Sequence, residues 1–186
     1  MSKLNVTLCP LSPRDIPAYR ALYEEAFPPA ERKEMPFMTD GPLSSLYDVL
    51  VIRTDDVSVA GMVILVRHGG LILLDYFAVS PALRGHGIGR AALPLIRAFC
   101  TQKHPGDHLF LKIEVPTADC PNPVQRVRRK AFYLSSGLIG TGIRLYIYGS
   151  DMELLAYPDD APFITPDGYR SLLRATFPPD MVPEDK

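Results

Sequence analysis

The chain of 186 residues contains no tryptophan and only three cysteines, Cys9, Cys100 and Cys120, which form no CxxC pair. Their odd number and wide spacing argue against a disulfide framework and against a zinc site. No apolar run approaches the roughly 18 residues of a membrane span, and the stretch from Met1 to Thr7 lacks the apolar centre of a secretion signal. We therefore expect a cytoplasmic protein with no bound metal and no membrane segment.

An excess of one charge sign is also missing, since 20 Lys and Arg face 21 Asp and Glu, which gives a net charge of −1. This balance argues against a protein that coats nucleic acid. The proportions of hydrophobic residues (47%) and charged residues (22%) are those of a soluble globular chain, and the length fits a single domain.

Proline, by contrast, is abundant, because its 19 copies are roughly twice the average usage of about 5%. Proline lacks a backbone donor and is excluded from central strands and helix interiors. Two windows contain no proline, from Leu43 to Ser80 and from Val124 to Tyr157. We expect these windows to hold most of a sheet.

The periodicity of the apolar residues predicts the order of the elements. Strands are expected at residues 5–9, 46–53, 57–66, 71–79, 109–115, 138–139 and 143–148. Helices are expected at residues 13–27, 30–38, 88–101, 123–136 and 166–176. The strand, helix and strand between residues 71 and 115 predict a parallel pair, whereas the earlier strands predict antiparallel hairpins. The predicted fold class is therefore mixed α+β, a mostly antiparallel sheet with one parallel pair flanked by helices.

The helix that follows Pro123 carries an apolar stripe of the kind that faces a core. The stripe consists of Val124, Val127, Ala131 and Leu134. Gly137 is expected to end this helix. We assign residues 1–150 to one domain and residues 151–186 to a C-terminal extension with one helix that is part of the same domain.

A glycine-rich segment separates the strand at 71–79 from the helix at 88–101. Its glycines, Gly85, Gly87 and Gly89, let a ligand approach the backbone N–H groups at a helix N-terminus, which favours a phosphate. A Walker A loop is excluded because Arg90 and Ala91 stand where that motif needs Lys and Ser or Thr. A dinucleotide fingerprint at residues 87–92 fits less well, because residues 80–85 separate it from its strand.

Two motifs resemble those of the GNAT superfamily of acetyl-CoA-dependent N-acetyltransferases. Residues 84–89, Arg-Gly-His-Gly-Ile-Gly, are similar to the family's pyrophosphate loop and follow a strand that ends Phe77-Ala-Val79. The run Ala-Phe-Tyr133-Leu-Ser-Ser-Gly137 is similar to the end of its tyrosine-bearing helix. The resemblance extends from about Asn5 to Tyr148 and makes residues 1–150 a GNAT-like acetyltransferase domain.

The resemblance implies acetyl-CoA as cosubstrate and assigns roles to individual residues. The main chain of Phe77 and Val79 would pair with the pantetheine arm. Tyr133 would protonate the departing thiolate, although it could instead be a core aromatic. The loop that would hold the CoA pyrophosphate consists of Arg84, Gly85, His86, Gly87, Ile88 and Gly89.

Two carboxylates are candidates for the general base, Asp75 in the strand at 71–79 and Glu114 near the end of the next strand. The alternative for both is an ordinary ion pair with Lys112 or Arg67. Arg126 stands where members of the family often have asparagine. It is either part of a solvated helix face, or it or Arg129 reaches a CoA phosphate or an acidic acceptor.

The predicted function is the transfer of an acetyl group from acetyl-CoA to a primary amine by direct attack. The alternative is a non-catalytic acyl-CoA sensor or interaction module with the same fold. The acceptor is a small-molecule or protein amine, bounded by residues 27–40 and by the last strands. Acidic residues in and before that segment, Glu24, Glu25, Glu31 and Glu34, are compatible with a cationic acceptor. No nucleic-acid or membrane partner is expected, and a homodimer is left open.

Overall fold

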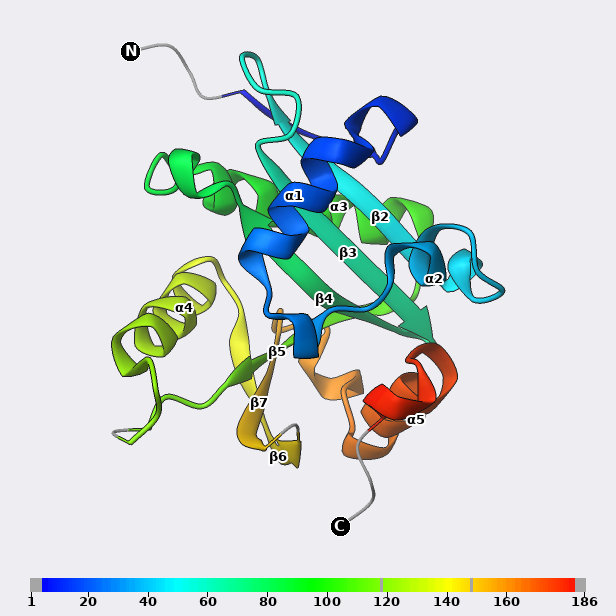
Figure 1. Ribbon diagram of the computed structural model, residues 1–186. Coiled ribbons are helices and arrows are strands. Elements are labelled where there is room, and N and C mark those ends of the chain that lie inside the picture. Colours follow the sequence, from blue (N-terminus) through cyan, green and yellow to red (C-terminus); the bar gives the residue numbers. More distant parts are fainter. Residues whose placement is uncertain (1–4, 118, 148, 183–186) are drawn as a thin grey trace. The chain divides into compact units, whose positions relative to one another are not determined.

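The computed structural model describes residues 5–117, 119–147 and 149–182. Its strands are β1 (Val6–Pro10), β2 (Tyr47–Thr54), β3 (Gly61–His68), β4 (Leu71–Val79), β5 (His108–Glu114), β6 (Ile139–Ile147) and β7 (Ser150–Ala156). Its α-helices are α1 (Ile16–Ala26), α2 (Met35–Thr39), α3 (Ile88–Lys103), α4 (Pro123–Ser135) and α5 (Pro166–Thr176), labelled in Figure 1.

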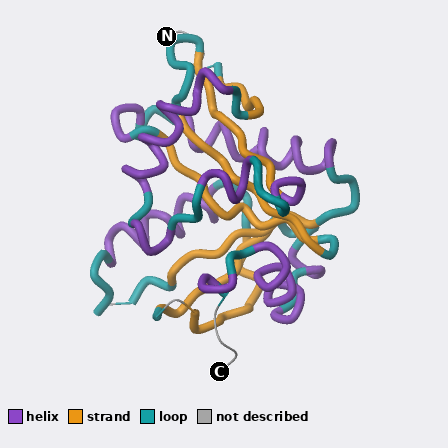
Figure 2. The backbone as a smooth tube through the Cα atoms, turned by 45° about the vertical axis from the view of Figure 1, so that its right-hand side comes forward, coloured by secondary structure: helices purple, strands orange, loops and turns teal. Residues whose placement is uncertain are grey.

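The strands form one seven-stranded sheet in the order β1-β2-β3-β4-β5-β7-β6. Strands β4 and β5 are parallel, and Leu71–Leu73 pair with His108–Phe110 at the beginning of both strands. The pairs β1 with β2, β2 with β3, β5 with β7 and β6 with β7 are antiparallel. Figure 2 shows the strands flanked by helices. The mixed α+β prediction, with one parallel pair, is confirmed.

The chain divides into two compact units. The first holds the described residues up to 66 together with 74–105, and the second holds 67–73 with the described residues from 106 onward. In the first unit, α1 and α3 lie on opposite sides of strands β2 and β3 (Figure 1). Strands that are covered on both sides are continuously apolar, as in the buried run from Met62 to Val66. The buried Tyr19 hydroxyl of α1 donates to the Val63 carbonyl at 3.1 Å.

The second unit contains a strand that we did not expect, β7, which lies between β5 and β6. Its charged residues Asp151 and Glu153 interrupt the apolar pattern that would have predicted it. Helix α5 packs in the same unit through Tyr169, whose ring lies edge-on to Phe110 at 5.8 Å. Thr165 caps α5, because its hydroxyl accepts from the Gly168 N–H at 3.0 Å. The division at residue 150 remains a prediction.

Two further boundaries differ from the prediction. The strand expected from residue 57 begins at Gly61, because the preceding residues form the turn that lets the Ala60 N–H donate to the Ile52 carbonyl. The two short strands expected at 138–148 are one strand, β6, with an irregularity between Gly140 and Arg144. Tyr148 lies outside the described residues. No helix in the described parts of the chain has the length and apolar content needed to cross a membrane.

The predicted apolar stripe of α4 does not face the core, as we expected, but faces solvent. Val124 and Val127 are 62% and 54% exposed, and Ala131 and Leu134 are exposed as well. The face toward the sheet carries Arg126 and Tyr133, both of which are buried. Acidic residues on β5 and β7 therefore attract the basic side of the helix, and its apolar side is left in water.

Candidate active site

The loop at residues 84–89 has the backbone that its glycines predict. Gly85 and Gly87 have φ values of 81° and 82°, in the left-handed region, and Gly87 is the N-cap of α3. A Cβ added at Gly85 would meet no atom within 4 Å, so the space beside the loop is open. No side chain caps this helix end. The first N–H groups of α3, which have no intrahelical acceptor, are therefore available to an anion such as a pyrophosphate.

Arg84 and His86 are turned back onto the loop. The Arg84 Nε donates to the Val79 carbonyl at 3.1 Å, so this carbonyl at the end of β4 is already bonded. The Nδ1 of His86 lies 3.0 Å from the Arg84 carbonyl, as in a turn. Phe77, Ala78 and Val79 are only half-buried, in contrast to the buried residues Leu71–Leu74 of the same strand. The end of β4 and the loop thus present accessible backbone.

Asp75 is held in a buried ion pair. Its carboxylate bonds to the Lys33 ammonium, and the two side chains are only 2% and 0% exposed. Lys33 comes from the segment between α1 and α2, 42 positions earlier in the chain. We predicted Asp75 as a base or as a partner of Lys112 or Arg67, and nothing in the local sequence indicated Lys33.

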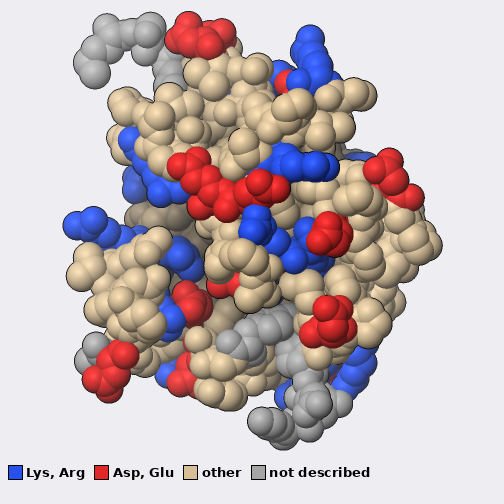
Figure 3. All heavy atoms as spheres, in the orientation of Figure 1, with Lys and Arg blue, Asp and Glu red and all other residues tan. Residues whose placement is uncertain are grey.

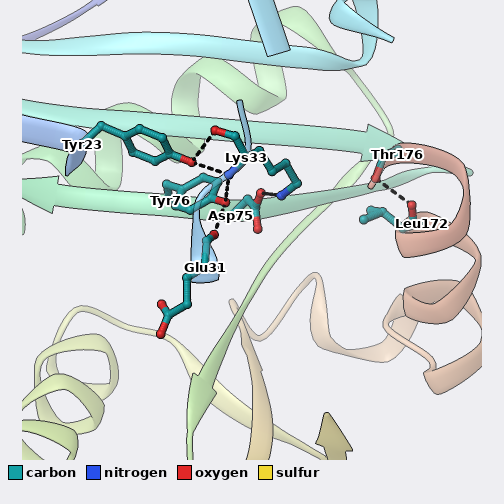
Figure 4. Close-up of polar contacts among 7 residues, drawn as sticks. All are labelled: Tyr23, Glu31, Lys33, Asp75, Tyr76, Leu172 and Thr176. Carbon is teal, nitrogen blue, oxygen red and sulfur yellow. Dashed lines mark hydrogen bonds and ion pairs between the residues drawn. The ribbon is translucent and has the colours of Figure 1, made fainter. Parts of the chain in front are cut away.

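Two tyrosines fix the segment that carries Lys33 (Figure 4). The Lys33 N–H donates to the Tyr23 hydroxyl at 2.9 Å and to the Tyr76 hydroxyl at 3.2 Å. The Tyr76 hydroxyl donates in turn to the Glu31 carbonyl at 2.6 Å. Burial raises the pKa of Tyr23 to about 12, and burial with the nearby Asp75 raises that of Tyr76 well above its usual range. Both hydroxyls therefore remain protonated and keep residues 31–33 on the sheet.

Glu114 at the end of β5 is paired with two arginines of α4. Its Oε1 accepts from Arg126 Nη2 at 2.5 Å, and its Oε2 lies 3.5 Å from Arg129 Nη1. Arg126 also donates from Nε to the Asn122 side chain at 2.9 Å, so Asn122 does not cap the helix as its position suggests. The ion-pair alternative for Glu114 is correct in kind, but its partners are Arg126 and Arg129.

Tyr133 is buried near the end of α4. Burial raises its pKa to about 12, with Arg129 opposing the shift. Among the residues that the structure describes, none forms a hydrogen bond with the Tyr133 hydroxyl, although the Phe132 ring lies 5.1 Å away. Gly137, with φ 93°, ends the helix in a Schellman motif, in which the Leu138 N–H donates to the Tyr133 carbonyl at 3.2 Å. The predicted helix end is confirmed.

The model of the acetyltransferase (GNAT) family matches residues 16–119, which is more than half of the chain. The chain belongs to the GNAT acetyltransferase family. It is therefore an acyltransferase enzyme. A search of curated proteins gave no match.

Solved structures of GNAT enzymes share the fold. A protein of Bacteroides thetaiotaomicron described as an acetyltransferase of the GNAT family has a TM-score of 0.67 and 22% identity, over 91% of this chain and 96% of that one. The ribosomal-protein-S18-alanine N-acetyltransferase of Escherichia coli has a TM-score of 0.59 and 21% identity, over 83% and 94%. Spermidine N-acetyltransferase of Vibrio cholerae, solved with CoA and spermine, has a TM-score of 0.63 and 13% identity, over 84% and 98%.

The GNAT match includes the residues predicted to bind CoA and both candidate bases, and it ends before Tyr133. Sequence reasoning found the loop because glycines leave a spacing signal. It missed Lys33, since one lysine in a charged run between two helices carries no such signal. Among the described residues, no group of three or more His, Cys, Asp and Glu could hold a metal ion.

Proposed function

We propose that this GNAT enzyme transfers an acetyl group from acetyl-CoA to a primary amine within a ternary complex in the cytoplasm. The observation that supports this most is the backbone of residues 84–89, where two left-handed glycines precede the open N-terminus of α3. The N–H groups there suit the CoA pyrophosphate. The neighbours that acetylate ribosomal protein S18 and spermidine support a protein or small-molecule amine as the acceptor.

In the proposed reaction, the amine nitrogen attacks the thioester carbon, the C–N bond forms and the C–S bond breaks. N–H groups of the main chain near Val79 would stabilise the oxyanion of the tetrahedral intermediate. Tyr133 would give its proton to the departing thiolate, and its hydroxyl is suited to this because it forms no hydrogen bond with the described residues. The products are the N-acetyl amine and CoA.

The surplus proton of the attacking nitrogen needs an acceptor, and the structure favours Glu114 over Asp75. Asp75 is bonded to Lys33 and almost fully buried. Glu114 keeps 26% of its side chain exposed, and its Oε2 lies 3.5 Å from Arg129 Nη1, so an amine in solution can reach this carboxylate more easily than it can reach Asp75. We therefore propose Glu114 as the general base and Asp75 as a residue that holds the segment of Lys33 in place.

The experiment is a measurement of CoA release over a panel of primary amines. Tyr133→Phe should lower kcat roughly 100-fold, as expected for the loss of a general acid. Its melting temperature should be unchanged, because the hydroxyl makes no hydrogen bond with the described residues. Since the pKa of Tyr133 is raised to about 12, the acid stays protonated and kcat should not fall between pH 7 and 10. Tyr146→Phe, at a residue 69% exposed, is the control and should behave as the wild type.

Glu114→Gln should also lower kcat, and Glu153→Gln separates the proposed base from a structural effect. Both changes remove an ion pair that anchors α4, since Lys130 Nζ lies 2.6 Å from Glu153 Oε2. An equal loss in the two variants would mean that Glu114 only holds the helix. CoA binding without amine-dependent release in the wild type would overturn the proposed function altogether.

A further inference from the structure

The first unit contains a pocket of about 490 Å³ beside α1 and the segment that follows it. This volume lies within the usual range of small-molecule sites, about 300–1,000 Å³. Tyr23 and Met35 are buried residues of its lining. Five charged residues also line it, and we call it the charged pocket. One of them, Lys33, is paired with Asp75, and the other four are Arg20, Glu24, Arg32 and Glu34.

The walls of the charged pocket are held in place. Its α1 wall is anchored because Tyr19 and Tyr23 are buried against the sheet. Its other wall follows Lys33, whose main chain is bonded by two tyrosines and whose ammonium is bonded by Asp75 (Figure 4). A pocket between fixed walls costs little ordering free energy when a ligand binds.

The charges of the pocket are of both signs, and the side chains of Arg20, Glu24 and Glu34 are exposed to solvent. Arg20 and Glu24 are one turn apart on α1, and Arg32 and Glu34 lie on the opposite wall, so each wall offers one charge of each sign. Among the described residues, none of the four takes part in an ion pair, unlike Lys33, Arg53 or Lys130. Figure 3 shows acidic and basic side chains next to one another over α1 and the segment after it.

This arrangement selects among ligand classes. A polyamine would pair with Glu24 and Glu34 but would place its cations beside Arg20 and Arg32. A purely anionic ligand would pair with the two arginines but would be repelled by the two glutamates. A molecule with one anionic and one cationic end satisfies both signs. We propose that the charged pocket binds the acceptor of the reaction, and that this acceptor is a zwitterion with a carboxylate beside its amine, as in an α-amino acid; the inference rests on the acetyl transfer proposed above.

The test is a calorimetric titration of the full chain with each of the twenty L-amino acids, each compared with its own carboxamide, which keeps the amine and loses the carboxylate. At least one amino acid should bind about tenfold more tightly than its carboxamide. Arg20→Gln should abolish that preference, whereas Arg14→Gln, an exposed arginine outside the pocket, should keep it. Glu24→Gln should weaken binding, and its neighbour Glu25→Gln should not. Equal binding of acids and carboxamides, or equal effects of the paired variants, would overturn the proposal.

Measurement of CoA release with the same compounds separates this inference from the proposed function. Release that does not distinguish the acids from the carboxamides would leave acetyl transfer standing and overturn the zwitterionic acceptor. Tight binding of an amino acid with no release of CoA would overturn its role as acceptor. Preferential acetylation of the amino acid that binds best would support both proposals.

Discussion

Gly85 and Gly106 show how one backbone conformation can serve two purposes. Both have positive φ values, 81° and 89°, and a Cβ added at either would meet no atom within 4 Å. Gly106 lies in the turn before β5, whereas Gly85 lies in the proposed pyrophosphate loop. The two glycines therefore have the same backbone conformation and the same free space, and only Gly85 lies in a proposed binding loop.

Gly85→Ala and Gly106→Ala should each destabilise the protein by about 1 kcal/mol, because an L-residue resists the left-handed conformation. Only Gly85→Ala should weaken binding of acetyl-CoA, by about tenfold, because only the loop that contains Gly85 is proposed to bind the pyrophosphate through its N–H groups. Urea unfolding and a calorimetric titration with acetyl-CoA measure the two effects. Equal affinities in the two variants would contradict the assignment of the loop.

At the level of elements, α4 shows what periodicity predicts and what it leaves out. The 3.6-residue repeat identified the helix and its end at Gly137, both of which the structure confirms. It could not identify the buried face, since Arg126 and Lys130 turn inward only because Glu114 and Glu153 lie on neighbouring strands. The apolar pattern also failed to predict β7, because the charged residues Asp151 and Glu153 interrupt it.

In α4, substitution of an apolar residue should destabilise the protein less than substitution of a charged one, which is the reverse of the usual order. Val127→Ser should change the free energy of unfolding by less than about 0.5 kcal/mol, because Val127 is more than half exposed. Arg126→Met should cost about 1–3 kcal/mol, because it removes hydrogen bonds to Glu114 and Asn122. Urea unfolding followed by circular dichroism measures both. A larger cost for Val127→Ser would show that the stripe is covered in solution.

The candidate site was predictable from the sequence to different extents. Residues 84–89 and the helix end after Tyr133 have fixed spacings, and the sequence alone predicts the position of both. The surroundings of Asp75 and Glu114 were not, because Lys33, Arg126 and Arg129 meet them only through tertiary structure. Spacing along the chain can predict a loop, but it cannot predict which charge a distant segment brings.

At the scale of the whole chain, residues 158–182 are part of the second unit. Helix α5 buries Tyr169, Leu172 and Leu173, and the Lys112 ammonium of β5 lies 5.2 Å from the centre of the Phe177 ring. Our assignment of the extension to the same domain as residues 1–150 remains a prediction.

Removal of residues 158–186 should abolish cooperative folding of the second unit. Three buried side chains at about 1.5–3 kcal/mol each represent a large part of a typical stability of 5–15 kcal/mol. The chain that ends at residue 157 should show no cooperative thermal transition for this unit, or should aggregate. A chain that ends at residue 182 keeps α5 and serves as the control. An unchanged melting curve for the shorter chain would make the extension dispensable.

The two faces of α4 respond to salt in opposite directions. Salt screens the part-exposed ion pairs of Glu114 with Arg129 and of Glu153 with Lys130, so these pairs hold α4 on its strands less strongly. Strongly salting-out ions such as sulfate also promote association of exposed apolar groups such as Val124 and Val127. Concentrated sulfate, which compacts most globular proteins, should therefore loosen this helix and make its outer face more adhesive.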